Sequence, residues 1–445
     1  MVPKKKIQSY TLPAMNKLWS QLRLKAARWI HVLAGILLCG TGCAAADTDT
    51  ASPAVRVVNC DDPVQSHKRG VCENHLGEAD FRALAPGVSW YYNWHYETQD
   101  KPPDDVPMEF IPMAWGNRPD ALDGLDRYLQ EAAKKPRVVL AINEPNLKGQ
   151  AFIKPEDTAT LYGKIKDIAD KYQLAVVGPN MSLGSPTDSS IKAMDPIENK
   201  EVTYTFMVPF LKAFYFYLGK TDIPALGLHT YGSIGEMKWA VESLHKEFNC
   251  PVWVTEYAEW HASDAAAERD YLIQATDFLE RTPYVQGYAW FKERADNAKI
   301  SLLEKEPGKL SDLGQAYVSL PSHDADLYYR IPGKLSAGKY LSIDQADILS
   351  NSHNDLLVTS NAAGATADYN IQVDAAGAYK LSLRALGTGK IEVLEKDQVL
   401  GSADASGSDV QTLDITAQLP DGPQTLRLRF GGSGIILSSI EFAKQ

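Results

Sequence analysis

The feature that most constrains the fold is a regular alternation of short apolar runs with amphipathic stretches between residues 66 and 321. Short apolar runs bounded by turn residues are typical of strands that are buried on both faces, as in parallel sheets. The sequence contains eight such candidate strands, at residues 69–73, 88–93, 109–115, 137–143, 174–180, 224–231, 252–258 and 285–291.

Helical patterns separate most of these runs. Pro155 begins one of them, and apolar residues then recur at helical spacing through Leu161, Ile165 and Ile168. Further helices are expected at residues 120–134, 202–218, 236–248 and 265–281. Eight strands alternating with helices over about 250 residues predict an α/β fold, a (β/α)8 TIM-like barrel at residues 66–321. A doubly wound open sheet is the alternative, although no GxGxxG or phosphate-binding loop follows any strand.

The pattern changes after Pro321. Residues 325–445 contain no long helical pattern and instead alternate apolar with polar residues, as in Tyr369, Ile371 and Val373. Glycine-containing turns separate these segments, which predicts an all-β sandwich of about 120 residues. All nine tryptophans lie at or before Trp290, so the two parts also differ in side-chain chemistry.

The first 46 residues have the layout of an export signal. Basic residues come first, an apolar stretch follows at residues 32–38, and small residues come next, with no Asp or Glu throughout. This order is typical of a secretory signal peptide and predicts an extracellular, periplasmic or outer-surface location. Two processing sites compete: residues 44–46 (AAA) fit ordinary cleavage, and residues 40–43 (GTGC) resemble a lipobox in which Cys43 receives a lipid anchor. Met15 is an alternative start, and residues 47–65 are expected to form a linker.

Charge and composition exclude several functional classes. The formal net charge is −11, which makes the chain a poor partner for nucleic acid or an anionic membrane. The apolar run at residues 32–39 is too short to span a bilayer, and no protein partner is indicated. The sequence contains no HExxH, CxxC or EF-hand-like loop, so neither a metal nor another cofactor is expected.

Cysteine positions agree with export. Cys60 and Cys72 flank a short polar loop, and in an oxidising compartment they are expected to form a disulfide. Cys250 is left over, and nothing around it supplies a base at a recognisable spacing. It is therefore interpreted as a buried free thiol.

The chemistry is expected at the carboxyl ends of the strands, where the active sites of such barrels lie. Glu144 follows the fourth strand and Glu256 ends the seventh. Ionised carboxylates at the ends of apolar strands are costly unless they are partnered or used. Two carboxylates across one gap suit cleavage of a glycosidic bond, because one protonates the leaving oxygen and the other attacks or stabilises the sugar.

Aromatic and polar residues surround these two carboxylates in the expected barrel. His229 and Tyr231 close the sixth strand and are expected to belong to the site. Flat aromatic rings pack well against the apolar faces of sugars. Tryptophans near the strand ends are therefore predicted to contact substrate, namely Trp90, Trp94, Trp115, Trp260 and Trp290.

Seven ordered motifs together resemble glycoside hydrolase family 128, whose members are endo-β-1,3-glucanases of clan A. They are residues 89–94 (SWYYNW), 112–116 (PMAWG), 143–146 (NEPN), 178–180 (GPN), 229–231 (HTY), 253–258 (WVTEYA) and 288–291 (YAWF). The resemblance covers residues 66–320 and implies a retaining enzyme that acts on β-1,3-glucan.

The same resemblance implies roles for individual residues. It makes Glu144 the acid/base and Glu256 the nucleophile, with Asn143 near the sugar 2-hydroxyl and Tyr231 hydrogen bonded to the nucleophile. Thr230 stands where many relatives carry an aromatic residue, which leaves product length open. Alternative functions are a retaining hydrolase of another β-glycan and a non-catalytic surface glycan-binding protein.

The C-terminal part is similar to carbohydrate-binding modules of families 6 and 35. Residues 367–373 (ADYNIQV), 377–384 (GAYKLSLR) and 439–442 (SIEF) carry this similarity. Such modules usually offer a tryptophan to the sugar, and residues 325–445 contain none. A structural appendage is therefore the alternative to a sugar-binding domain.

Overall fold

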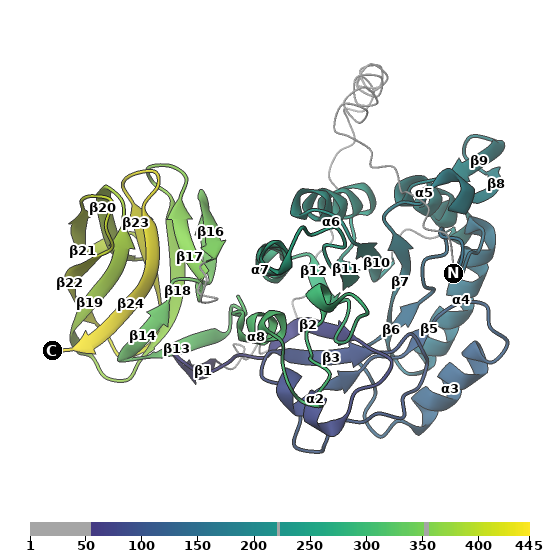
Figure 1. Ribbon diagram of the computed structural model, residues 1–445, viewed down its shortest axis with the longest axis horizontal. Coiled ribbons are helices and arrows are strands. Elements are labelled where there is room, and N and C mark those ends of the chain that lie inside the picture. Colours follow the sequence, from purple (N-terminus) through teal and green to yellow (C-terminus); the bar gives the residue numbers. More distant parts are fainter. Residues whose placement is uncertain (1–54, 220–222, 351–355) are drawn as a thin grey trace, which may run out of the picture. The chain divides into compact units, whose positions relative to one another are not determined.

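The computed structural model of the protein describes residues 55–219, 223–350 and 356–445 (Figure 1). The expected export signal, with Cys43 and both processing sites, lies outside the described residues. Within the described part of the chain, no helix has the length and apolarity needed to cross a membrane.

A parallel nine-stranded sheet forms the first of the two main regions. Its order is β4-β3-β2-β12-β11-β10-β7-β6-β5. The strands are β2 (Ser66–Cys72), β3 (Val88–Tyr92), β4 (Glu109–Phe110), β5 (Met113–Ala114), β6 (Val138–Ala141), β7 (Ala175–Ser182), β10 (Ala225–Thr230), β11 (Val252–Tyr257) and β12 (Val285–Trp290).

The sheet is curled, because its two outermost strands are consecutive in the chain. Only Ile111 and Pro112 separate β4 from β5. The Ile111 N–H donates to the Tyr91 carbonyl of β3 at 2.9 Å, and the Leu140 N–H of β6 donates to the Pro112 carbonyl at 2.9 Å. One short segment thus bonds to strands on both of its sides, which is consistent with the predicted TIM-like barrel. The predicted third strand is confirmed as two pieces, which meet at a proline that cannot donate a hydrogen bond.

Helices follow most of the strands (Figure 1). They are α2 (Glu78–Leu84), α3 (Ala121–Glu131), α4 (Pro155–Lys171), α5 (Met207–Leu218), α6 (Ile234–Phe248), α7 (Ala265–Arg281) and α8 (Asp312–Ser319). Local chemistry sets their ends: the Ser233 and Asp264 side chains accept backbone N–H groups at the starts of α6 and α7. Gly219 ends α5 with a φ of +65°, in the left-handed region that glycine adopts readily.

The helix expected over residues 202–218 is wrong in its first turn. Residues 200–204 form β9 (Lys200–Tyr204), which pairs with β8 (Ile191–Asp195) as an antiparallel hairpin, and α5 begins only at Met207. The run Val202-Thr203-Tyr204 consists of β-branched and aromatic residues, which favour a strand wherever a partner strand is available.

The C-terminal region consists of two sheets around a separate apolar core. The seven-stranded sheet contains β1 (Arg56–Asn59), β13 (Leu327–Ile331), β15 (Ser342–Asp344), β18 (Thr366–Val373), β20 (Gly389–Glu395), β21 (Gln398–Ala405) and β23 (Gly422–Phe430). The six-stranded sheet contains β14 (Gly333–Ser336), β16 (Ala346–Ser350), β17 (Leu356–Ser360), β19 (Gly377–Leu386), β22 (Gln411–Leu419) and β24 (Ile436–Lys444).

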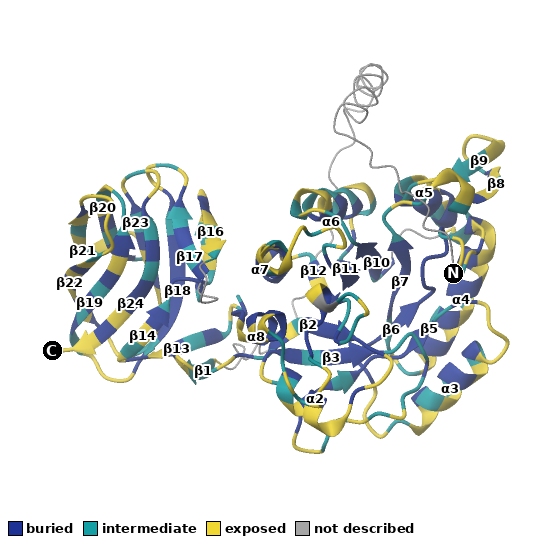
Figure 2. Cartoon of the chain, in the orientation of Figure 1, coloured by how far each residue is buried: buried dark blue, intermediate teal, exposed yellow. Residues whose placement is uncertain are grey.

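Burial alternates along the strands of this region, as Figure 2 shows. In β22, for example, Leu413, Ile415, Ala417 and Leu419 are buried while the residues between them are exposed. The predicted inward residues Tyr369, Ile371 and Val373 are all buried as well. These observations confirm the alternation from which β structure was predicted for this region.

Two expectations for the N-terminal side are wrong. Residues 56–59, expected within a linker, form β1, which pairs in parallel with β13 of the C-terminal sheet. Cys60 and Cys72 are both free and buried instead of forming a disulfide. Cys60 lies in the core of the C-terminal region and donates to the Arg330 carbonyl at 3.2 Å. Cys72 ends β2 of the curled sheet and donates to the Trp290 carbonyl at 3.2 Å. The two thiols are separated because β1 has joined the other region. Cys250 is a buried free thiol, as expected.

Candidate active site

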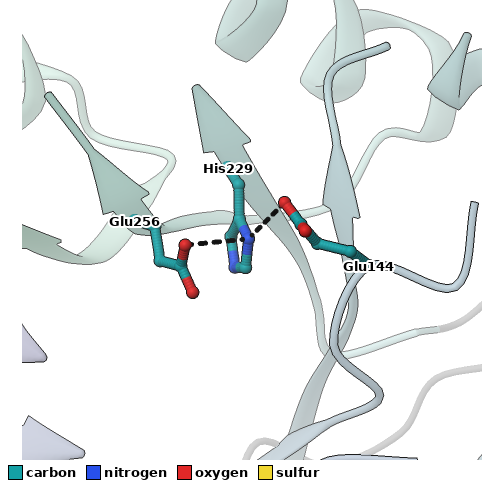
Figure 3. A group of neighbouring side chains, drawn as sticks. All are labelled: Glu144, His229 and Glu256. Atoms are coloured by element: carbon teal, nitrogen blue, oxygen red, sulfur yellow. Dashed lines mark hydrogen bonds and ion pairs between the residues drawn. The ribbon is translucent and has the colours of Figure 1, made fainter. Parts of the chain in front are cut away.

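Three strands of the curled sheet bring Glu144, His229 and Glu256 together (Figure 3). Glu144 lies just beyond β6, His229 is in β10 and Glu256 is in β11. The exposed fractions of the three residues are 5%, 1% and 5%, so all of them are buried. Glu144 has a φ of +43°, in the left-handed region that non-glycine residues seldom adopt. Such backbone is found where the surrounding structure holds a functional side chain in place.

His229 lies between the two carboxylates. Its Nδ1 atom is 3.0 Å from Glu144 Oε1 and 3.4 Å from Glu256 Oε2. One carboxylate oxygen from each glutamate lies within 4.8 Å of the other. The two residues that the sequence placed at the ends of distant strands therefore face each other across one small gap.

Hydrogen-bond donors surround Glu256. Its Oε1 atom accepts from Trp94 Nε1 at 2.7 Å and from the Tyr92 hydroxyl at 3.2 Å. The Tyr231 hydroxyl donates to Oε2. An indole N–H can only donate, so the Trp94 contact favours a carboxylate oxygen that carries no proton.

Glu144 has a different environment. Its side chain has the contact with His229, and its backbone N–H donates to the Asn180 carbonyl at 2.7 Å. Beside it, Asn143 donates through Nδ2 to Gln150 Oε1 at 3.1 Å. The Asn143 Oδ1 atom is buried, and the described residues offer it no hydrogen-bond partner. A buried acceptor without a partner is costly, so this oxygen is available to a donor from substrate.

The charges of these groups depend on one another. Burial lowers the pKa of His229, but the adjacent carboxylates of Glu256 and Glu144 outweigh burial and raise it above its ordinary value of 6.5. Burial, together with the nearby Glu144, raises the pKa of Glu256 above its ordinary value of 4.5, and His229, Tyr231 and Trp94 offset only part of this rise. Burial and the nearby Glu256 also raise the pKa of Tyr231 far above 10.0, so this phenol keeps the proton that it donates.

Aromatic residues form the walls beside this group. Trp94 and Trp115 line a cavity of about 310 Å3, together with Asn74, His75, Asn93, His95 and Arg118. Trp260 is 46% exposed, and its ring centroid lies 5.3 Å from that of Tyr231. Trp94 and Trp115 thus line this cavity and Trp260 is exposed, and the contact of all three with substrate stays a prediction.

Two of the predicted contact residues are wrong. Trp90 and Trp290 have no exposed surface. Trp90 Nε1 donates to the Lys68 carbonyl at 2.9 Å, and Trp290 Nε1 donates to the Ile300 carbonyl at 2.7 Å. A Cβ atom on Gly70 would lie 2.2 Å from the Trp90 ring, so this ring fills the space that the glycine leaves in the neighbouring strand. Both rings are core residues that no ligand can reach.

Several residues of the site were not singled out as site residues from the sequence. They are Tyr92, which donates to Glu256, Phe291, which packs against Tyr231 and Trp94, and the polar residues Asn180 and Thr255. Tyr92 is the last residue of β3, and Phe291 directly follows β12. Their position at the carboxyl ends was the signal that would have favoured them over Trp90 and Trp290.

The Glu144, His229 and Glu256 ligand atoms are close enough together for an ion to be considered. However, Glu256 already accepts hydrogen bonds from Tyr92, Trp94 and Tyr231. A cation there would face the positive ends of these donor groups, whereas hard cations are held by free oxygen ligands. The side chains thus fit a hydrogen-bonded carboxylate better than a metal ligand, and the absence of a metal from the reaction stays a prediction.

Comparison with known proteins agrees with this geometry. Residues 70–317, more than half of the chain, match the family described as the glycosyl hydrolase catalytic core. A solved GH128 (subgroup II) endo-β-1,3-glucanase from Pseudomonas viridiflava is 31% identical, with 58% of this chain and 100% of that chain covered and a TM-score of 0.50. A second such enzyme, from Sorangium cellulosum, is 31% identical over 58% of this chain and 100% of that one, with a TM-score of 0.49. No curated protein matches the chain. The chain therefore belongs to the glycosyl hydrolase catalytic core family, with a GH128 catalytic domain at residues 70–317, and the protein is a glycoside hydrolase.

Proposed function

We propose that the protein is a retaining endo-β-1,3-glucanase. The observation that carries the proposal is the pair of buried carboxylates, Glu144 and Glu256, with an oxygen of each within 4.8 Å of the other. The substrate comes from the relatives, since the 31%-identical enzyme from Pseudomonas viridiflava is an endo-β-1,3-glucanase. A cavity lined in part by Trp115 and by Trp94, which donates to Glu256, supports a sugar ligand.

The spacing supports retention of configuration. Retaining glycosidases hold their two carboxyl groups about 5–5.5 Å apart, whereas inverting enzymes separate them by about 6.5–9.5 Å to admit a water molecule. Here one oxygen of Glu144 and one oxygen of Glu256 lie within 4.8 Å of each other. That gap leaves no room for an attacking water between Glu256 and a bound sugar.

The hydrogen bonds support distinct roles for the two carboxylates. Glu256 accepts from Tyr92, Trp94 and Tyr231, and these donors stabilise an ionised nucleophile. Glu144 lacks such a set and faces the His229 ring nitrogen, which suits a group that gives up and regains a proton. Glu256 is accordingly the nucleophile and Glu144 the acid/base.

The reaction then proceeds in two balanced steps. Glu256 Oε attacks the anomeric carbon while the bond from that carbon to the leaving oxygen breaks, and Glu144 transfers its proton to this oxygen. In the second step Glu144 takes a proton from water, whose oxygen displaces Glu256 from the sugar. The unpaired Asn143 Oδ1 atom is available to accept a hydrogen bond from a sugar hydroxyl during both steps.

Two substitutions test the assignment on laminarin and defined laminari-oligosaccharides. E256Q keeps the shape of the side chain and removes the nucleophile, so hydrolysis is expected to fall by about 10³-fold or more. E144Q is expected to lose hydrolysis of glucans but to cleave aryl β-glucosides whose leaving group needs no proton. The matched control is E268Q, which changes another buried glutamate on α7 and should leave hydrolysis intact.

The products decide between this proposal and its competitors. Proton NMR during hydrolysis should show the β-anomer first, and internal cleavage should release oligosaccharides of several lengths. Glucan binding by the wild type without released sugar would overturn the enzyme assignment. Turnover of a different β-glycan in preference to laminarin would overturn the substrate.

Export and lipidation are part of the same proposal. They rest on the basic, apolar and small-residue order of residues 1–46, and on Cys43 at the end of a lipobox-like sequence. The mass of the mature N-terminus and labelling with a fatty acid distinguish lipidation at Cys43 from cleavage after Ala46. The C-terminal region is proposed as a carbohydrate-binding module. Retention of an E256Q variant on insoluble β-1,3-glucan, compared with retention of the Pseudomonas viridiflava enzyme, whose whole chain matches 58% of this one, tests it.

A further inference from the structure

A directional chain of hydrogen bonds runs behind the two carboxylates, from the main chain of β6 to His229. Asn180 Nδ2 lies 2.8 Å from the Ala141 carbonyl, Asn180 Oδ1 lies 2.9 Å from Thr255 Oγ1, and Thr255 Oγ1 lies 3.0 Å from His229 Nε2. Asn180, Thr255 and His229 are at most 1% exposed. The direction of each bond follows from its neighbour.

The first bond settles the orientation of the Asn180 amide. A main-chain carbonyl can only accept, so the group that faces Ala141 must be the NH2 of Asn180. The Asn180 oxygen therefore faces Thr255. The absence of a side chain at Gly227 makes room for this arrangement, since a Cβ atom there would lie 2.0 Å from Asn180 Oδ1.

The second bond then settles the Thr255 hydroxyl. An amide oxygen can only accept, so the Thr255 hydroxyl donates its one proton to Asn180 Oδ1. The hydroxyl has only lone pairs left for His229. The contact between Thr255 Oγ1 and His229 is consequently satisfied only when Nε2 carries a proton.

We propose that Asn180 and Thr255 are positioning residues that hold His229 in its Nε2–H form, so that His229 Nδ1 and Glu144 share the one proton that the acid/base delivers. This inference rests on the proposed function, because it concerns the acid step of that reaction. When Nε2–H donates to Thr255, the neutral imidazole has its lone pair on Nδ1. This atom lies 3.0 Å from Glu144 Oε1. Glu144 can then keep its proton by donating it to Nδ1.

The opposite tautomer would have the opposite effect. A neutral ring with its proton on Nδ1 would donate to Glu144 and stabilise the ionised carboxylate, which cannot act as an acid. The raised pKa of His229, which Glu256 and Glu144 cause against the effect of burial, supports a proton held between the ring and Glu144. Glu256 is the weaker partner, because its distance from Nδ1 is 3.4 Å and Tyr231 already donates to the same oxygen.

The other titratable groups around the carboxylates do not compete for this proton. From β10 the Tyr231 phenol faces Glu256, and from β3 the Tyr92 phenol does so. From β2 the Cys72 thiol donates to the Trp290 carbonyl. Burial raises the pKa of each of these three groups well above its ordinary value. They therefore keep their own protons and do not take the one between Glu144 and His229.

Nitrogen-15 NMR of the wild-type protein with labelled histidine tests the tautomer directly. The ring signals that disappear in H229Q identify His229 among the nine histidines of the chain. Nε2 is expected to carry a proton at every pH at which the protein is folded. A proton on Nδ1 with an unprotonated Nε2 would overturn the proposal, whether or not the Thr255 variants fold.

Substitution of Thr255 tests the consequence for catalysis. T255V removes the acceptor from Nε2, and the ring is expected to change to the Nδ1–H form. The basic limb of the pH dependence of kcat/KM should then move down by about one pH unit, because Nδ1 would donate to Glu144 instead of accepting its proton. T255S restores the hydroxyl and should restore the wild-type limb.

The matched control is T276V on α7, where another buried threonine hydroxyl is hydrogen bonded to Tyr257, away from the carboxylates. It should leave the pH profile unchanged. A basic limb that is the same in T255V, T276V and the wild type would overturn the proposal. Failure of the wild type to hydrolyse glucan would instead overturn the proposed function, while the NMR measurement would still decide the tautomer.

Discussion

The catalytic region and the C-terminal region both bury carboxylates, but they treat them differently. In the C-terminal region, Asp368 is 8% exposed and accepts two hydrogen bonds from Arg427, at 2.7 and 2.8 Å, and one from Ser342 at 3.0 Å. Its charge is matched by a guanidinium that binds both oxygens. In the catalytic region, Glu144 and Glu256 share a single histidine.

The two regions also use buried tyrosines differently. In the C-terminal core, the Tyr369 hydroxyl donates to the main-chain carbonyl of Ala337 at 2.9 Å. Tyr92 and Tyr231 instead donate to a carboxylate. A buried polar group that is paired with the backbone or with an opposite charge holds a fold together. Buried groups of like charge that converge on one gap are costly to the fold and are retained where they act on a ligand.

The largest expected effect concerns the donors to Glu256. Y231F removes one hydrogen bond to the nucleophile, so kcat on laminari-oligosaccharides should fall by about 10²-fold, as for loss of one donor in a preorganised site. Y369F makes the same chemical change in the C-terminal core and should lower thermal stability without a change in kcat per folded molecule. Equal kcat values for Y231F and Y369F would contradict the distinction between the regions.

The next prediction concerns the matched carboxylate. R427A leaves the buried Asp368 carboxylate without its cation, which should lower the free energy of unfolding by about 1–3 kcal/mol. Chemical denaturation measures this loss. Because Asp368 has no part in the reaction, kcat and KM on short oligosaccharides should equal those of the wild type. Lost kcat at full folding would show that the C-terminal region takes part in the chemistry.

A smaller effect is expected for the exposed ring beside the site. Trp260 packs edge-on against Tyr231 and is not bonded to Glu256, so W260A should raise KM for long oligosaccharides by about tenfold, the scale of one lost aromatic contact. The value of kcat should change much less. Steady-state kinetics with oligosaccharides of increasing length separate the two, and a dominant loss of kcat would instead place Trp260 among the groups that act on the nucleophile.

The smallest expected effect is on stability and depends on pH. Burial raises the pKa of Glu268 from 4.5 to about 7, with a backbone N–H from Glu259 as its opposing partner. Since the folded pKa is the higher one, the stabilisation is complete below about pH 4.5 and is lost as the pH rises through about 7. E268Q should abolish this loss and raise the free energy of unfolding above pH 7 by about 1–2 kcal/mol. Parallel curves for both proteins between pH 5 and 8 would refute the assignment.

Much of the fold could be predicted from periodicity because burial imposes it. Strands that are covered on both faces need continuous apolar runs, and those at residues 252–258 and 285–291 are confirmed as β11 and β12. The helix at residues 265–281 is confirmed with the same ends as α7, because Asp264 caps its first turn. The strand in front of α5 was missed, since Val202 and Tyr204 pack with a hairpin partner that local spacing does not reveal.

The candidate site was predictable only where chain position implies spatial position. Carboxyl ends of parallel strands meet at one edge of a sheet, so Glu144, His229 and Glu256 could be placed together before any coordinates. The same reasoning could not separate Trp94 from Trp90. These residues lie four positions apart, and the structure exposes one ring to the site while it covers Gly70 with the other.

The order of apolar and polar residues by itself determined that this chain has a parallel sheet with helices, a separate β region and two glutamates at the carboxyl ends of two of the parallel strands. Tertiary structure alone decided that β1 joins a sheet of the C-terminal region and that Cys60 and Cys72 stay apart. It also decided that Asn180 and Thr255 are hydrogen bonded in a chain that ends at His229. Periodicity is a local consequence of burial and can be read along the chain. The partner of a thiol, or the direction of a shared proton, depends on atoms that come together only after the strands have packed.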